Sequence, residues 1–239
     1  GTYTIDASQA ASATNYQNIA SATRDLRGLS RTDGGAANGS GVSGPVVFKM
    51  KGTFNEKMDL FYVNGVSATN TITFDGQGAT TITNGASFSA RHVVRFNDGA
   101  ERYTVKNCKI VSTGTSYAWG VHFYRYNRYC NLDSNEIDLS SATSGSYNNT
   151  VGVVVSRLTT GTQHSSYSDY GSSRCARDIN IRANHIHGKG SGSPNGPTTG
   201  ISTTNNYYFY NTGINFNINI EGNRIVDFKS YGIRNYRTN

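Results

Sequence analysis

The sequence contains little proline, little cysteine and few charged residues, and it has no long hydrophobic run. Proline and cysteine each occur 3 times in 239 residues, and charged residues make up 15% of the chain. No apolar stretch approaches the roughly 18 residues that a membrane-spanning helix needs, and no signal peptide begins at Gly1. No long run of basic residues and no recognisable nucleic-acid-binding module is present. We therefore expect neither membrane insertion nor nucleic acid as a partner.

The three cysteines are an odd number and lack the C-x-x-C spacing typical of metal sites. At least one thiol among Cys108, Cys130 and Cys175 must be free or paired outside this chain. Cys130 and Cys175 could pair across one loop, and the spacing does not decide whether they do. No cofactor and no metal are predicted.

Glycine, by contrast, is abundant, with 27 residues, and hydrophobic residues make up 36% of the chain. Aromatic and β-branched residues are spread evenly, which argues against disorder and favours many short strands joined by tight turns. Lysine and arginine exceed the acidic residues by 22 to 15, giving a net charge of +7. Such an excess can attract acidic polysaccharide, or can serve solubility alone.

One short amphipathic helix is predicted over residues 14–29. Thr14 and Gln17 fit a capping box at its start, and Gly28 fits a helix stop. Apolar residues recur at spacings of three and four between them: Ile19, Ala22, Leu26 and Leu29. A loop rich in glycine, serine and alanine follows over residues 32–43.

From residue 45 onward the period changes to two, and an eight-residue pattern repeats. Apolar or small residues occupy the first and third places, asparagine usually the sixth, and isoleucine the eighth. The four copies are YTVKNCKI at 103–110, CNLDSNEI at 130–137, INIRANHI at 179–186 and INIEGNRI at 218–225. A glycine followed by valine or isoleucine comes after each copy, at Gly120, Gly152, Gly200 and Gly232.

Stacked repeats explain this pattern, because one repeat cannot bury its own apolar face. We expect the isoleucines to form an inward column and Asn135, Asn184 and Asn223 to form a hydrogen-bonded ladder that Cys108 interrupts. The fourth places should face outward and attract one another, since they alternate in charge: Lys106, Asp133, Arg182 and Glu221.

These observations predict an all-β fold, a single right-handed parallel β-helix with a short N-terminal capping helix. Residues 1–44 should form a strand, the helix and the loop, and residues 45–239 the β-helix, with loop excursions near 157–177 and 188–199. The glycine at position 1 and the repeat that opens at 231–235 suggest a trimmed, C-terminally incomplete chain. We expect further repeats or another subunit to stack at the C-terminal end.

Several segments carry a resemblance to a known family. GTYTI at 1–5, the helix, GVSGPVVF at 41–48, GTFNE at 52–56 and ATNTITF at 68–74 occur in this order. Together they resemble the start of β-helix regions in large Bacteroidetes proteins exported by the type IX secretion system. The later repeats look like those of pectin-lyase-like proteins. The resemblance implies a secreted or cell-surface location but fixes no activity, because this scaffold carries lyases, hydrolases and adhesins.

An enzyme would need converging catalytic groups on one outer face. The strands that follow the glycines offer no acidic residue, so a hydrolase with paired carboxylates is not favoured. A metal-independent lyase acting on acidic glycans remains an alternative, with a base and cations taken from His122, Tyr124, Arg125 and Arg157. His185 and His187 share a strand face, but two histidines are an incomplete metal site.

Glycan binding by the same surface does not require converging catalytic groups. Tyrosine faces can stack on sugars and arginines can attract acidic groups; the predicted ligand-binding residues are Tyr124, Arg125, Tyr126, Arg157, Arg234 and Tyr236. The partner would be an acidic polysaccharide or a cell-surface glycan. The interpretation we favour is a non-catalytic adhesin or surface-fibre segment, a stiff rod with weak glycan contact.

Overall fold

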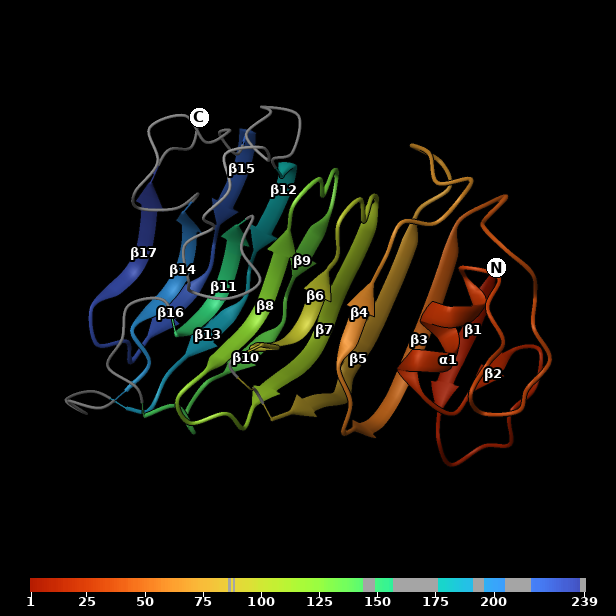
Figure 1. Ribbon diagram of the computed structural model, residues 1–239, viewed down its shortest axis with the longest axis horizontal. Helices are drawn as coiled ribbons and strands as arrows, with labels where there is room; N and C mark the ends of the chain where they lie inside the picture. The colour runs from red at the N-terminus through yellow and green to blue at the C-terminus, as the bar shows by residue number, and fades with distance from the viewer. Residues whose placement is uncertain are drawn as a thin grey trace.

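A computed structural model shows a strand-rich chain with two parallel sheets and one short helix (Figure 1). The structure describes residues 1–85, 87, 89–143, 149–156, 176–190, 196–204 and 216–236. Most of the first predicted loop excursion, at residues 157–175, and part of the second, at residues 191–195, lie outside these ranges. Two parallel sheets and a single short helix among the described residues agree with the predicted all-β class.

The first sheet has 11 strands, ordered β15-β12-β9-β7-β5-β3-β1-β2 with a branch through β10, β13 and β16. Its strands are β1 (Thr2–Asp6), β2 (Asn15–Tyr16), β3 (Val46–Phe54), β5 (Ile72–Asn84), β7 (Tyr103–Ser112), β9 (Asn131–Asp133), β10 (Glu136–Asp138), β12 (Arg177–Arg182), β13 (His185–His187), β15 (Phe216–Glu221) and β16 (Arg224–Val226).

The second sheet has 6 strands in the order β17-β14-β11-β8-β6-β4. They are β4 (Met58–Leu60), β6 (His92–Phe96), β8 (Ala118–Tyr124), β11 (Thr150–Ser156), β14 (Thr199–Thr204) and β17 (Tyr231–Tyr236). From β3 onward the chain visits the two sheets in turn, and each strand pairs in parallel with its equivalents one repeat earlier and later. This arrangement is compatible with a β-helix-like solenoid.

The core between the sheets is built from columns of identical side chains. Ile137 lies in register with Ile110 on one side and Ile186 on the other, and Ile186 with Ile225. The first three are fully buried, so the predicted isoleucine column is confirmed. Aromatic rings stack in the same way: the centroids of Phe96 and Phe123 lie 4.3 Å apart.

The predicted asparagine ladder is also present, at a corner of the first sheet. The Asn184 Oδ1 accepts from the backbone N–H of Asn135 at 2.9 Å, and its Nδ2 donates to the Leu132 carbonyl at 2.8 Å. The Asn223 Oδ1 accepts from the backbone N–H of Asn184, also at 2.9 Å. Where the ladder begins, the backbone N–H of Cys108 donates to Asn135. The amides thus satisfy backbone groups that the corner removes from regular strand pairing.

The corner needs this support because each repeat turns there through a left-handed residue. The residue before each ladder position has a positive φ: Asn107 at 54°, Ser134 at 55°, Ala183 at 53° and Gly222 at 62°. A non-glycine residue in this region costs free energy, on the order of 1 kcal/mol or more. The hydrogen bonds of the ladder offset that cost.

The helix α1 spans Ile19–Asp25 and lies at the N-terminal end of the stack (Figure 1). Its N-cap is Asn18, whose Oδ1 accepts from the Ser21 N–H at 2.7 Å. The predicted capping box of Thr14 and Gln17 is therefore wrong, because the residues between them form strand β2. The helix ends at Asp25, before the predicted stop at Gly28, which has a φ of 70° and lies in the turn that follows. In the described ranges, no helix is long and apolar enough to cross a membrane.

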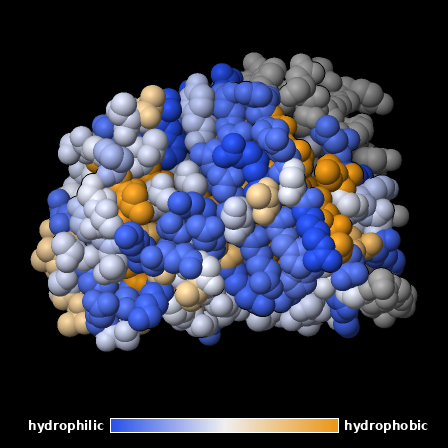
Figure 2. All heavy atoms as spheres, turned by 180° about the vertical axis from the view of Figure 1, so that it is seen from behind, coloured by the Kyte–Doolittle hydropathy of each residue, from blue (hydrophilic) through white to orange (hydrophobic). Residues whose placement is uncertain are grey.

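From behind, most of the surface is hydrophilic, and hydrophobic side chains are exposed in small separate areas (Figure 2). The outward fourth places of the repeat contribute to this polarity and lie in register across β7, β9, β12 and β15. Arg182 pairs with Asp133 at 3.0 Å, as the alternation in charge predicts. Lys106 instead lies 3.1 Å from Asp75, one repeat earlier.

The glycines that follow each repeat allow the two sheets to approach closely. A Cβ on Gly152 would overlap with the Cγ2 methyl of Ile186 and with the carbonyl oxygen of Gly200, and Gly120 faces Ile137 in the same way. We expect Gly152→Ala to reduce the free energy of unfolding by about 1–3 kcal/mol, because the buried strand cannot shift without losing its register.

Chemical denaturation would measure this effect. Gly44→Ala is the matched control, since a Cβ there meets nothing within 4 Å. Equal stability of the two variants would contradict the close contact between the glycine and isoleucine columns.

A second test addresses the ladder. Asn184→Ala leaves the buried backbone groups of Asn135 and Leu132 without side-chain partners, which should cost roughly 2–4 kcal/mol. Asn219→Ala changes an exposed asparagine on a neighbouring strand and should stay within about 0.5 kcal/mol of the parent. Thermal melts of both variants would show whether the corner amides carry this stability.

Candidate functional site

Of the residues predicted for a lyase, His122 and Tyr124 lie on the outer face of the second sheet and Arg125 follows the end of β8, whereas Arg157 lies outside the described residues. Asp59, Arg95 and His122 are in register there on β4, β6 and β8. His122 is completely buried, its Nε2 lies 3.3 Å from the Ser156 hydroxyl, and its ring packs edge-on against Trp119 at 4.8 Å. His122 therefore points away from the core as predicted, but the expectation that it is accessible to a substrate is wrong.

Burial also decides the protonation of His122. Removal from water lowers the pKa of its imidazole well below the usual value, and the neighbouring charges of His92 and Arg95 lower the pKa further. The ring is neutral, as a general base must be. However, a base must come within hydrogen-bonding distance of the substrate proton, and this ring is enclosed by protein.

An acidic residue does lie on this face, on a strand outside those that follow the glycines. Asp59 Oδ1 lies 3.2 Å from His92 Nε2 and 3.0 Å from Arg95 Nε, and it accepts from the Asn97 amide at 3.0 Å. Burial raises the pKa of Asp59, but the bond to His92 and the charges of His92 and Arg95 outweigh it and lower the pKa. The sequence search missed Asp59 because strand β4 precedes the first glycine repeat.

The predicted ligand-binding residues do not form one site. Tyr124, Arg125 and Tyr126 are neighbours, with the Arg125 guanidinium 4.9 Å from the Tyr124 ring centroid and 3.6 Å from Asp98. Arg234 lies on β17, three strands from β8, or about 14 Å at the usual strand spacing. Arg157 and the side chain of Tyr236 lie outside the described residues.

The two cysteines that the structure describes are free and buried. Burial raises the pKa of each thiol, Cys108 and Cys130, to about 12. Thiolate chemistry at either residue is thereby suppressed. Cys175 lies outside the described ranges.

A polar groove of about 430 Å³ lies on the outer face of the first sheet. We call it the corner groove; it is lined by Thr71, Arg102, Thr104, Tyr129, Asn131, Asp178, Asn180 and Asn217. The Tyr129 side chain is 44% exposed, and the Arg102 guanidinium lies 4.3 Å from its ring centroid. An exposed aromatic ring therefore stands beside a row of amides.

Two positions of the repeat form this groove: the residue just before each copy and the second place within it. The residues just before each eight-residue copy turn the chain through a left-handed conformation: Arg102, Tyr129, Asp178 and Asn217, with φ between 51° and 58°. The second places of the copies form an outward amide ladder. Asn131 donates to the Thr104 hydroxyl at 3.1 Å, and Asn180 donates to Asn131 Oδ1 at 2.8 Å.

The signal for this groove was present in the sequence. The second place of the repeat reads Thr104, Asn131, Asn180 and Asn219, but only the sixth-place asparagines were assigned to a ladder. Asn219 continues the outward row, with its Nδ2 3.4 Å from Asn180 Oδ1. The sequence does not distinguish Tyr129 from the other tyrosines, because spacing alone does not show which ring is exposed.

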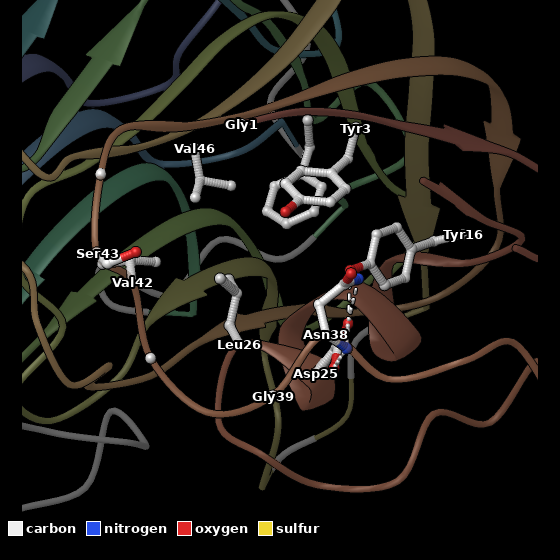
Figure 3. Close-up of a pocket in the computed structure, with 13 residues that line it drawn as sticks. Gly1, Tyr3, Tyr16, Asp25, Leu26, Asn38, Gly39, Val42, Ser43 and Val46 are labelled. Carbon is white, nitrogen blue, oxygen red and sulfur yellow. Dashed lines mark hydrogen bonds between the residues drawn. The ribbon is translucent and has the colours of Figure 1, made fainter. Parts of the chain in front are cut away.

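A second cavity, of about 250 Å³, lies near the N-terminus between α1, the following loop and β3 (Figure 3). Its polar wall is already paired. The Tyr16 hydroxyl donates to Asp25 Oδ2 at 2.6 Å, and the Asn38 amide donates to both residues. Because these polar groups are hydrogen-bonded to one another, we assign them a structural role at the end of the core.

No family model, curated protein or solved structure matches this chain significantly. The functional conclusion therefore depends on the geometry of the molecule itself.

Burial of His122 predicts a pH dependence of stability. Its pKa is lowered in the folded state, so the unfolded chain binds more protons below the ordinary histidine pKa of 6.5. Stability should therefore fall as the pH drops below about 6.5, by up to about 1.4 kcal/mol per pH unit for this residue. His92, whose pKa burial also lowers, adds to the loss.

Denaturation midpoints between neutral and mildly acidic pH would measure the slope. His122→Gln should reduce the slope of stability against pH. His185→Gln changes a half-buried residue on the other sheet and should leave most of that slope unchanged. An unchanged slope in His122→Gln would show that the imidazole titrates normally and is not enclosed.

Proposed function

We propose that this chain is a right-handed parallel β-helix segment of a large secreted or cell-surface protein, and that it binds glycans in the corner groove. Strand pairing that stays parallel from repeat to repeat supports the proposal of one continuous coil. Its role would be that of an adhesin or surface fibre, in which a stiff rod presents a binding face. The bacterial source and the type IX export route follow from the resemblance and remain predictions.

The outward amide ladder beside Tyr129 is the observation that carries the proposal. Sugars are bound by aromatic faces together with fixed polar groups, and the groove offers both within one repeat of each other. Adjacent strands repeat about every 4.8 Å. A polysaccharide lying across the strands would therefore meet the polar side chains of Thr104, Asn131 and Asn180 at successive steps.

The charge of the groove favours a neutral glycan. Its charged lining residues are Arg102 and Asp178, one of each sign, and Arg102 is also paired with Glu101 at 3.3 Å. The attraction to acidic polysaccharide predicted from the net charge would have to act elsewhere, at residues such as Arg125. We therefore assign neutral cell-surface glycans to the corner groove.

The lyase alternative receives less support. It needs His122 to reach a substrate proton, and this residue has no exposed surface. Tyr124 and Arg125 are half-buried beside it, so the cation would be present without an accessible base.

Co-sedimentation with a panel of insoluble neutral and acidic polysaccharides tests the proposal. Tyr129→Ala should weaken binding about 5- to 30-fold, the effect of losing a central aromatic contact of 1–2 kcal/mol. Tyr62→Ala removes a tyrosine that is 55% exposed but lies outside the groove, and it should bind like the parent chain.

Equal binding by the two variants would exclude the corner groove. Release of unsaturated uronates from acidic polysaccharides, lost in Arg125→Ala, would instead favour the lyase.

A further inference from the structure

Two neighbouring strands of the first sheet place four side chains that can bind metals, two carboxylates and two imidazoles, on one outer face. Glu136 and Asp138 lie on β10, and His185 and His187 lie on β13. The strands pair in parallel, with Glu136 opposite His185 and Asp138 opposite His187. Because the residues between them, Ile137 and Ile186, point into the core, the other four side chains share the outer face.

Three of these side chains converge. One ligand atom from each of Glu136, Asp138 and His187 lies within 4.8 Å of the other two. His187 Nε2 lies 3.2 Å from Glu136 Oε1, and His187 Nδ1 lies 3.8 Å from Asp138 Oδ1. An ion takes only one of the two His187 nitrogens, and ligands about 2.0–2.2 Å from a tetrahedral ion stand about 3.4 Å apart. The three ligand atoms, within 4.8 Å of one another, would therefore have to move closer together by side-chain rotation.

A cation is already attracted to this position. The Lys109 ammonium lies 2.8 Å from Glu136 and 4.0 Å from Asp138. The Lys109 side chain is 43% exposed, so it can withdraw into water when a stronger cation arrives. The two carboxylates thus have a charge that a divalent ion could neutralise in place of the ammonium.

His185 stands next to the three converging groups. Its ring centroid lies 5.0 Å from that of His187, and its Nε2 lies 3.1 Å from the Arg224 guanidinium. A nitrogen that accepts from a guanidinium is unprotonated, so this imidazole is neutral, and its Nε2 would have to leave Arg224 in order to bind an ion. Neutral imidazole is the form that binds metal.

We propose that Glu136, Asp138 and His187 bind a divalent transition-metal ion of the zinc type, with Lys109 displaced and His185 beside the fourth position. Mixed imidazole and carboxylate ligands suit zinc and its neighbours better than magnesium or calcium, which prefer oxygen alone. The ion would join β10 to β13 and thereby clamp two successive repeats. The site lies apart from the corner groove and does not depend on glycan binding.

Calorimetric titration of Zn²⁺ into the tag-free chain at neutral pH tests the site. We expect one equivalent to bind, and His187→Ala to lose affinity by more than the roughly 10- to 100-fold that outer-shell changes cause. Lys109→Met should bind more tightly, because it removes the competing ammonium. Asp133→Asn is the matched control, since this carboxylate on the same face pairs with Arg182 and should not affect Zn²⁺ affinity.

A second measurement separates metal binding from misfolding. Zn²⁺ should raise the melting temperature of the parent chain and of Asp133→Asn, and leave that of His187→Ala unchanged. The melting temperatures without metal show whether each variant is folded. The proposal is overturned if the parent chain binds no Zn²⁺, if His187→Ala binds as well as the parent, or if Lys109→Met binds more weakly.

Discussion

The fold depends on one constraint, that every residue of a repeat stacks on its equivalent in the next repeat. Parallel pairing in fixed register sets isoleucine on isoleucine and asparagine on asparagine. The close approach of Gly152 to Ile186 then fixes the distance between the sheets. Each side chain must pack against, or form hydrogen bonds with, an identical side chain in the next repeat. The repeat therefore uses branched aliphatic residues inside and amides at the corners.

Stacking also explains which parts of the structure could be predicted. The isoleucine column and the sixth-place ladder follow from identical residues recurring in aligned segments, which the sequence displays directly. The pairing of Asp133 with Arg182 followed from the same alignment. Lys106 differs because it has an acidic neighbour on each side, and only the structure shows that it pairs with Asp75.

The errors have a common physical cause. Alternation along a strand distinguishes two faces, but it does not say whether the outer face meets water. His122 lies between the core residues Val121 and Phe123, as an outward position should, yet it is buried, and so is Trp119, which packs against it. Likewise, the start of α1 was misplaced because Asn15 and Tyr16 pair with a strand that is distant in sequence from the helix. Tertiary contacts overrode a local capping signal.

The two outer faces therefore serve different purposes. On the second sheet, some outward side chains are buried, as His92 and His122 are, and His92 is paired with Asp59. On the first sheet they remain partly exposed and form regular rows of amides, carboxylates and imidazoles. The corner groove and the Glu136–His187 cluster are both products of that regularity, one from the second place of the repeat and one from its end.

The ladder also bears on how such a chain can change over evolutionary time. Successive ladder positions are separated by 27, 49 and 39 residues, yet the hydrogen bonds between them have the same form. Insertions and deletions in the loops between strands thus leave the core unchanged, whereas a single insertion within a strand would move every following side chain of that strand to the opposite face. Natural variants should differ in length in these loops and hardly at all within the strands, so new surface features can be acquired without changing the stacked core.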